Sequence, residues 1–321
     1  MMASIYRPLL TKEYSTVLAN EIRNYSDASC YLTIGKTAQW SDSETLPEFA
    51  PPLPIDDNNY KHQFWQDVIG YIRVAKENTR LVIDRNDWVS GETFDKDDVV
   101  VVYNTIDDLG QETYPDALDG FMMYRCILVP DPIVPSTDIP TGYGASTGPR
   151  NDGYEWEYLY TIPPAEIAEF CTPEYVVVPS EEELISDLAY WSRDMVSSTI
   201  FDHGRMCYSI GAHKLMLRTI LADNYFRNYL VQETSYRQIG IVLKPYSYSL
   251  APPCGEPSPW FGVNGACSLF GWKIIANPAS AAIYEAFEIL ANTGELLYME
   301  NRAPIFRSFN ETNDIRIILG F

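Results

Sequence analysis

Proline and glycine occur frequently along the whole of this sequence. Twenty-two prolines and 18 glycines are spread over 321 residues. Proline lacks a backbone N–H donor and interrupts helices and inner sheet ladders, while glycine favours turns. The sequence therefore predicts many short strands joined by turns and loops, with few long helices. The prolines between residues 39 and 59 exclude regular ladder pairing there, and residues 130–153 are expected to form a second long surface loop.

Local patterns predict the individual elements. Apolar residues recur at helical spacing over 12–25, with Thr11 as the expected N-cap, and a short helix is expected near 62–69. Ser180 and Glu183 have the spacing of a capping box. Residues 283–290 fit a helix or a strand. The expected strands are 30–34, 71–75, 80–83, 99–103, 121–129, 154–162, 174–178, 206–210, 214–220, 238–244, 295–299, 305–309 and 315–319, with a Pro-, Gly- and Trp-rich interruption at 245–271 and a polar turn at 300–302.

The strand 154–162 has the clearest alternation in the chain. Its aromatic residues are expected to share one buried face, and its acidic residues the opposite, solvated face. The buried set is Tyr154, Trp156, Tyr158 and Tyr160; the opposite set is Glu155, Glu157 and Leu159.

Charge excludes several classes of partner. The formal net charge is −21, from 44 acidic and 23 basic residues. Phosphate backbones and anionic membrane surfaces should repel such a chain, so neither nucleic acid nor a membrane is an expected partner. The N-terminal residues lack a secretory h-region, and no run of 18 apolar residues exists. Six scattered cysteines without a C-x-x-C pair indicate free thiols in a reducing cytoplasm.

Four motifs resemble chemical sites, and each has a simpler structural interpretation. The sequence Gly144-Ala-Ser-Thr-Gly148 fits the pattern of a nucleophile elbow. Together with Gly142 it also fits the pattern of a dinucleotide-binding turn. Neither flank supplies the strand and the helix that both motifs require. Asp95-Lys-Asp-Asp98 begins like a calcium loop but lacks its later glycine and glutamate. His62, His203 (beside Asp202) and His213 are too dispersed for a predicted metal site.

Glu155 and Glu157 form the fourth motif. They project from one strand face roughly 7 Å apart, close to the separation of paired carboxylates in glycoside hydrolases. Because the aromatic residues face away from them, a buried aromatic face with a solvated acidic face is the simpler interpretation.

Several longer strings resemble a known family. They occur in family order along nearly the whole chain, and several are specific strings rather than generic strand patterns. The strings are Leu32-Thr-Ile-Gly-Lys-Thr-Ala-Gln-Trp40, Phe49-Ala-Pro-Pro-Leu-Pro54, Val82-Ile-Asp-Arg-Asn-Asp-Trp88, Tyr124-Arg-Cys-Ile-Leu-Val-Pro-Asp131, Asp152-Gly-Tyr-Glu-Trp-Glu-Tyr-Leu-Tyr160 running on to Pro164, Cys171-Thr-Pro-Glu-Tyr-Val-Val-Val-Pro179, Tyr236-Arg-Gln-Ile-Gly-Ile-Val-Leu-Lys-Pro245 and Gly294-Glu-Leu-Leu-Tyr-Met-Glu-Asn-Arg-Ala-Pro-Ile305. They resemble the baseplate wedge proteins encoded by gene eight of T4-like contractile-tailed phages.

The resemblance implies a fold and a role. The fold it implies is mainly β with a smaller α/β part: β-sandwich-like antiparallel sheets with short helices and long loops. Residues 1–95 and 232–321 are expected to form a composite α/β domain around inserted β domains at 96–231. The implied role is a non-enzymatic virion subunit, a homodimer that packs against other wedge subunits. Residues 131–152 and 246–291 depart from the family pattern.

Both lines of argument lead to the same expectations about function. We expect no catalytic, cofactor-binding or metal-binding residues, no cofactor and no small-molecule substrate. The alternatives are a β-rich glycoside hydrolase carrying Glu155 and Glu157, and a carbohydrate-binding module at a tail tip that stacks sugars on Tyr and Trp.

Overall fold

The fold is described by a computed structural model of the chain. The structure describes residues 12–36, 38–54, 68–103, 120–142, 146, 148–180, 183–184, 206–221, 235–243, 246–249, 260–262, 269–276, 283–289, 295–306 and 312–321. The chain divides into two compact units. Unit 1 comprises residues 1–21, 80–216 and 320–321, and unit 2 comprises residues 22–79 and 217–319. The division into 1–95 with 232–321 and 96–231 stays a prediction.

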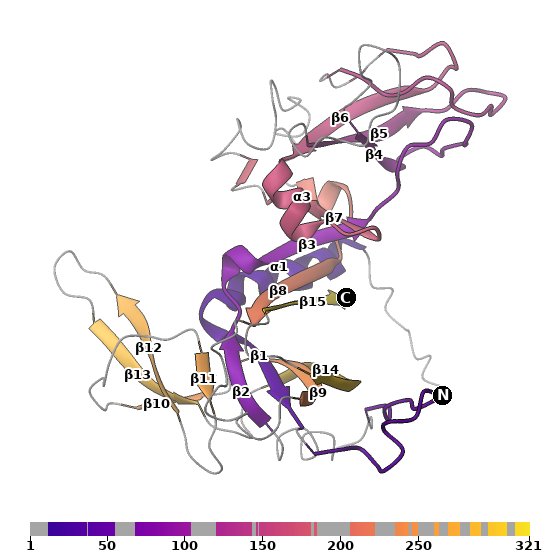
Figure 1. Ribbon diagram of the computed structural model, residues 1–321. Coiled ribbons are helices and arrows are strands. Elements are labelled where there is room, and N and C mark those ends of the chain that lie inside the picture. Colours follow the sequence, from indigo (N-terminus) through magenta and orange to yellow (C-terminus); the bar gives the residue numbers. More distant parts are fainter. Residues whose placement is uncertain are drawn as a thin grey trace, which may run out of the picture. The chain divides into compact units, whose positions relative to one another are not determined.

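Unit 2 contains a five-stranded antiparallel sheet in the order β11-β2-β1-β9-β14 (Figure 1). Its inner strands β1 and β9 are buried along almost their whole length, as runs of β-branched and apolar residues predict. A separate three-stranded sheet has the order β10-β13-β12. The strands of the two sheets are β1 Cys30–Gly35, β2 Val68–Arg73, β9 Ser235–Leu243, β10 Tyr246–Ser249, β11 Trp260–Gly262, β12 Leu269–Ala276, β13 Ile283–Ile289 and β14 Glu295–Phe306.

Unit 1 contains a three-stranded antiparallel sheet of β4 Val99–Tyr103, β5 Phe121–Leu128 and β6 Glu155–Ile162, in that order. One face carries an aromatic core that also takes in the preceding loop. The buried members of this core are Phe94, Val100, Val102, Met122, Tyr124, Cys126, Tyr154, Trp156 and Tyr158.

A β-bulge in β6 changes which residues share a face. Met123 pairs with Tyr160 while the next residue, Tyr124, pairs with Tyr158, so Leu159 is the extra residue of the bulge. Because neighbours on β5 face opposite sides, their partners Tyr158 and Tyr160 also face opposite sides. The prediction that Tyr160 shares the face of Tyr158 is therefore wrong. Tyr160 instead donates a hydrogen bond of 3.1 Å to the Val177 carbonyl, and burial raises its pKa.

The remaining elements include a four-stranded sheet in the order β15-β8-β3-β7. The helix α3 follows β6 directly, with prolines at its N-cap and first helical position. These elements are α1 Lys12–Ser29, η1 Lys76–Asn78, β3 Thr79–Asp84, α3 Pro164–Phe170, β7 Tyr175–Val178, α7 Met206–Ser209, β8 Lys214–Leu221 and β15 Asn313–Gly320.

The predicted fold class is confirmed: the chain is mainly β, built from antiparallel sheets with short helices and long loops. Three predictions of secondary structure are wrong. Met206–Ser209 is helical rather than extended. The interruption expected at 245–271 contains β10, β11 and the start of β12. The expected turn at 300–302 lies inside one strand, β14, whose register with β9 shifts between Asn301 and Ile305. Residues 283–289, left open from the sequence, form β13.

Some predicted elements extend beyond the described residues. Thr11 lies outside them, as does most of the helix expected at 62–69, although residues 68 and 69 belong to β2. The helix expected over 12–25 is present and continues to Ser29.

Gly120 provides a test of the entry into β5. Its φ is +81°, and a Cβ there would lie 2.4 Å from the Ile162 carbonyl oxygen. Gly120→Ala is expected to destabilise unit 1 by roughly 2–3 kcal/mol, because left-handed strain adds to a backbone clash. Urea unfolding of both variants measures the difference. The matched control is Gly91→Ala, which has a φ of +94° but open space around its Cβ, and should cost about 1 kcal/mol. Equal losses in the two variants would show that the clash with Ile162 relaxes freely.

Candidate functional site

The two glutamates of β6 are held by neighbouring groups. Glu157 is 8% exposed, and its carboxylate lies 3.8 Å from the Arg125 guanidinium on β5. The prediction of a solvated acidic face is therefore wrong for Glu157. Glu155 is half-buried and accepts a hydrogen bond from the Ser146 hydroxyl. With Arg125 as its counter-ion, Glu157 acts in this arrangement as an internal cross-link between β5 and β6.

The glycine-rich motif is described only in part. Residues 143–145 and 147 lie outside the described residues. Ser146 is exposed and accepts a hydrogen bond of 3.0 Å from the Gly148 N–H. Within the described residues 130–142 and 148–154, no strand precedes Ser146 and no helix follows it, so these residues do not supply the flanks of a nucleophile elbow.

The aspartate cluster forms a turn. The Asp95 N–H donates a hydrogen bond of 2.7 Å to the Asp98 carboxylate, and the Asp97 N–H donates one of 2.8 Å to the Cys126 carbonyl. The turn is thus fastened to the end of β5. Within the described ranges, no group of three or more His, Cys, Asp or Glu side chains is placed to hold a metal ion.

The histidines and cysteines have ordinary environments where they are described. His213 contacts the Gly211 carbonyl through Nδ1 at 2.9 Å, while His62, Asp202 and His203 lie outside the described residues. Cys30, Cys126, Cys171 and Cys207 are buried free thiols. Burial raises the pKa of Cys30 to about 12, so this thiol stays protonated and unreactive near neutral pH.

The loop between β5 and β6 is organised by Asp152. One carboxylate oxygen accepts hydrogen bonds from the Ser136 hydroxyl and from the backbone N–H groups of Thr137 and Asp138, at 2.8 to 3.0 Å. The other accepts one of 3.1 Å from the Tyr154 N–H. Burial opposes ionisation of Asp152, but these hydrogen bonds outweigh it and lower its pKa.

Asp152→Ala is expected to release this loop. The variant should lose about 1–2 kcal/mol of stability, and amide exchange at Thr137 and Asp138 should accelerate, because both N–H groups lose their acceptor. Hydrogen exchange with mass spectrometry measures the effect. Glu92→Ala is the control, since the exposed Glu92 meets the same loop through its backbone carbonyl. Unchanged exchange in Asp152→Ala would mean that the loop is held by other contacts.

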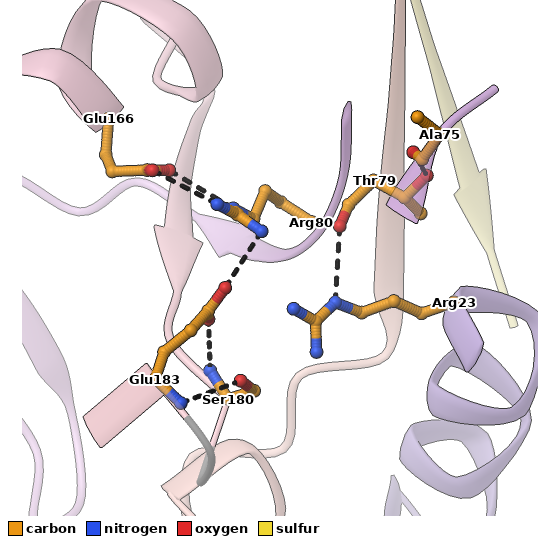
Figure 2. Close-up of polar contacts among 7 residues, drawn as sticks. All are labelled: Arg23, Ala75, Thr79, Arg80, Glu166, Ser180 and Glu183. Atoms are coloured by element: carbon orange, nitrogen blue, oxygen red, sulfur yellow. Dashed lines mark hydrogen bonds and ion pairs between the residues drawn. The ribbon is translucent and has the colours of Figure 1, made fainter. Parts of the chain in front are cut away.

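Arg80 joins three segments of unit 1 (Figure 2). Its guanidinium makes a two-pronged contact with Glu166 of α3 at 3.1 and 3.2 Å, and a third at 2.8 Å with Glu183. It also lies 5.1 Å from the centre of the Phe170 ring. Burial alone would lower the pKa of Arg80, but Glu166 and Glu183 together raise it.

Glu183 also completes the predicted capping box. The Ser180 N–H donates a hydrogen bond of 2.8 Å to the Glu183 carboxylate, and the Glu183 N–H donates one of 3.3 Å to the Ser180 hydroxyl (Figure 2). The prediction from the Ser-x-x-Glu spacing is confirmed.

A buried ion pair lies in unit 2. Arg237 of β9 contacts both carboxylate oxygens of Glu44 at 2.5 and 2.8 Å, and the two side chains are only 4% and 3% exposed. Hydrogen bonding from Arg237 lowers the pKa of Glu44 against the opposing effect of burial. A lone arginine in the apolar run of β9 was a signal for such a pair, but nothing in the sequence pointed to Glu44.

The loop 38–54 covers part of the outer strand β14. The Trp40 indole donates a hydrogen bond of 3.0 Å to the Arg302 carbonyl, and the Asn301 side-chain amide donates one of 2.8 Å to the Pro52 carbonyl. Asn301 also accepts a hydrogen bond from Gln238 of β9. The segments that first suggested a family, 32–40, 49–54, 236–245 and 294–305, are therefore brought together here.

On β14 itself, three polar side chains contact one another. Glu300 accepts hydrogen bonds of 2.6 Å from Tyr298 and 2.8 Å from Arg302. Burial opposes ionisation of Glu300, but these two hydrogen bonds lower its pKa, while burial and the Glu300 contact raise the pKa of Tyr298 to about 12. The strand thus carries its own counter-ions.

These features define a class: a mainly β protein whose buried polar groups fasten the chain's own segments together. Among the described residues, no helix is both long and apolar enough to cross a bilayer. The chain belongs to the Phage-Gp8 family (Bacteriophage T4, Gp8), whose model matches residues 10–139 and 132–254. It is similar to the baseplate wedge protein gp8 of Enterobacteria phage T4, with 28% identity over 350 aligned positions that cover 99% of this chain and 98% of the relative.

Proposed function

We propose that this chain is a structural, non-enzymatic subunit of the baseplate wedge in a contractile phage tail. In this proposal it acts as a homodimer, packs against other wedge subunits, and is assembled in the host cytoplasm into the virion. The observation that carries the proposal is the end-to-end match with a baseplate wedge protein, which covers 99% of one chain and 98% of the other.

Ion pairs within the chain support a structural role. Arg80, Glu166 and Glu183 cross-link a strand, a helix and a capped turn, and Arg237 with Glu44 fixes a loop to a sheet. In this proposal, these ion pairs favour one defined arrangement of the segments over alternatives. A subunit that holds partners in register needs such fixed surfaces.

Three measurements test the proposal. Purified virions analysed by mass spectrometry should contain the chain, and baseplates should fail to form in a phage that lacks its gene. Sedimentation of the purified chain at micromolar concentration should give twice the monomer mass. Absence from the virion would overturn the structural role, and a monomer would overturn the dimer.

The enzymatic alternative has its own test. The purified chain should not cleave polysaccharides. Cleavage that disappears in Glu157→Gln would overturn the non-enzymatic proposal, because Glu157 would then act on a substrate rather than pair with Arg125.

A further inference from the structure

Three large apolar side chains of unit 2 are exposed around the covered end of β14. Leu46 is 49% exposed, Leu53 is 86% exposed and Phe306 is 66% exposed. Single exposed apolar residues are ordinary, but several together mark an interaction surface.

Hydrogen bonds and strand pairing attach the segments that carry these residues to β9 and β14. Leu53 follows Pro52, whose carbonyl is bound by Asn301 of β14. Leu46 lies two residues from Glu44, which is bound by Arg237, and Arg237 in turn bonds to Ser235, the strand partner of Phe306. We call Leu46, Leu53 and Phe306, with the exposed acids Asp42 and Glu48, the edge surface.

The edge surface is held in place before any partner arrives. Successive turns fix residues 41–49 through the backbone hydrogen bonds Glu44 to Ser41, Leu46 to Ser43 and Phe49 to Leu46, at 3.0 to 3.2 Å. Prolines 47, 51, 52 and 54 restrict the same loop further. Exposed apolar residues on a pre-ordered loop lose little conformational entropy on binding.

Charge selects the kind of partner. Residues 38–54 contain three acidic residues, of which Glu44 is neutralised by Arg237, and no lysine or arginine. Two further cations lie beside this loop: Lys36, over the Trp40 ring, and Arg302, which is paired with Glu300. Two copies meeting through this surface would bring Asp42 and Glu48 of each copy together, in chains that each carry a net charge of −21.

We infer that the edge surface docks a different protein, through an apolar segment flanked by lysine or arginine residues. This inference rests on the proposed function, in which the chain packs against other subunits of the particle. The proposed homodimer then uses another surface.

Site-specific crosslinking identifies the occupant. The photoreactive residue p-benzoylphenylalanine replaces Phe306 in phage-infected cells, and assembled particles are irradiated and analysed by mass spectrometry. The control places the same residue at Ile220, an apolar position of unit 2 that is 48% exposed. The expected result is a crosslink from position 306 to a lysine- or arginine-bearing segment of another polypeptide. The control with the photoreactive residue at position 220 should not give this product.

Several results would overturn the inference. These are a crosslink to a second copy of this chain, a crosslink to an acidic segment, an equal yield from position 220, or no crosslink in particles that contain the chain. Particles without the chain would instead contradict the proposed function, so the two failures are distinguishable.

Association kinetics with the crosslinked protein test the charge argument. Asp42→Lys with Glu48→Lys should slow association roughly ten-fold at low salt, with a smaller difference at high salt, because rim charges act mainly on the encounter rate. Glu77→Lys, at an exposed position of η1, is the matched control and should leave the rate unchanged. Faster association of the double variant would overturn the proposed cationic partner.

Discussion

Trp156→Ala is expected to destabilise unit 1 by about 4 kcal/mol, the largest loss among the substitutions considered. The indole is fully buried, packs edge-on to Phe94 at 5.3 Å between ring centres and stacks with Tyr154 at 6.1 Å. Its removal leaves a cavity that the neighbouring side chains of β5, β6 and the loop around Phe94 cannot fill. Urea unfolding, with hydrogen exchange of β5 and β6 as the local reporter, measures the loss.

The matched substitution is Trp156→Phe. It keeps an aromatic ring beside Phe94 and most of the apolar area, so less than half of the loss is expected. Trp156→Ala with a loss below about 1 kcal/mol would contradict the assignment of this cluster as the core of unit 1. Faster exchange confined to unit 2 would contradict it as well.

Glu44→Gln is expected to destabilise unit 2 by about 3 kcal/mol, because the Arg237 charge stays buried without its counter-ion. This is the lower end of the range for broken buried pairs, and the two side chains are only 4% and 3% exposed. Urea unfolding of Glu44→Gln, Arg237→Met and the double variant forms a cycle. The double variant should lose less than the sum of the single losses.

The same pair predicts a pH dependence. The pKa of Glu44 in the folded chain lies below its ordinary value of 4.5, so the stabilising contribution is complete above that value and is lost as the pH falls through the lowered pKa. The native chain should therefore lose more stability than Glu44→Gln on acidification below pH 4.5. Parallel acid-unfolding curves for the two proteins would contradict this assignment.

Much of the fold could be predicted because local chemistry determines it. The β-branched run 99–103 forms β4 with the predicted bounds, and the Ser180–Glu183 spacing forms the predicted capping box. In both cases the signal and the structure lie within a few residues of each other. The helix at Met206–Ser209 shows the limit, because four residues of mixed propensity leave tertiary contacts to decide.

Strand register and long-range pairing could not be read in the same way. The bulge at Leu159 leaves the spacing of aromatic residues in the sequence unchanged, yet places Tyr160 and Tyr158 on opposite faces. Arg237 finds its counter-ion 193 residues away, at Glu44. Such partners depend on which segments of the chain pack together, and local patterns in a single sequence do not predict that packing.

The cover over β14 also bears on how the free subunit behaves when it is concentrated. An outer strand with open N–H and C=O groups can template the addition of another chain and lead to aggregation. Here the indole of Trp40 already occupies the Arg302 carbonyl, and Pro51, Pro52 and Pro54 bring no N–H to extend a ladder. Colloidal stability before assembly therefore depends on residues 38–54, and not only on the electrostatic repulsion between acidic chains.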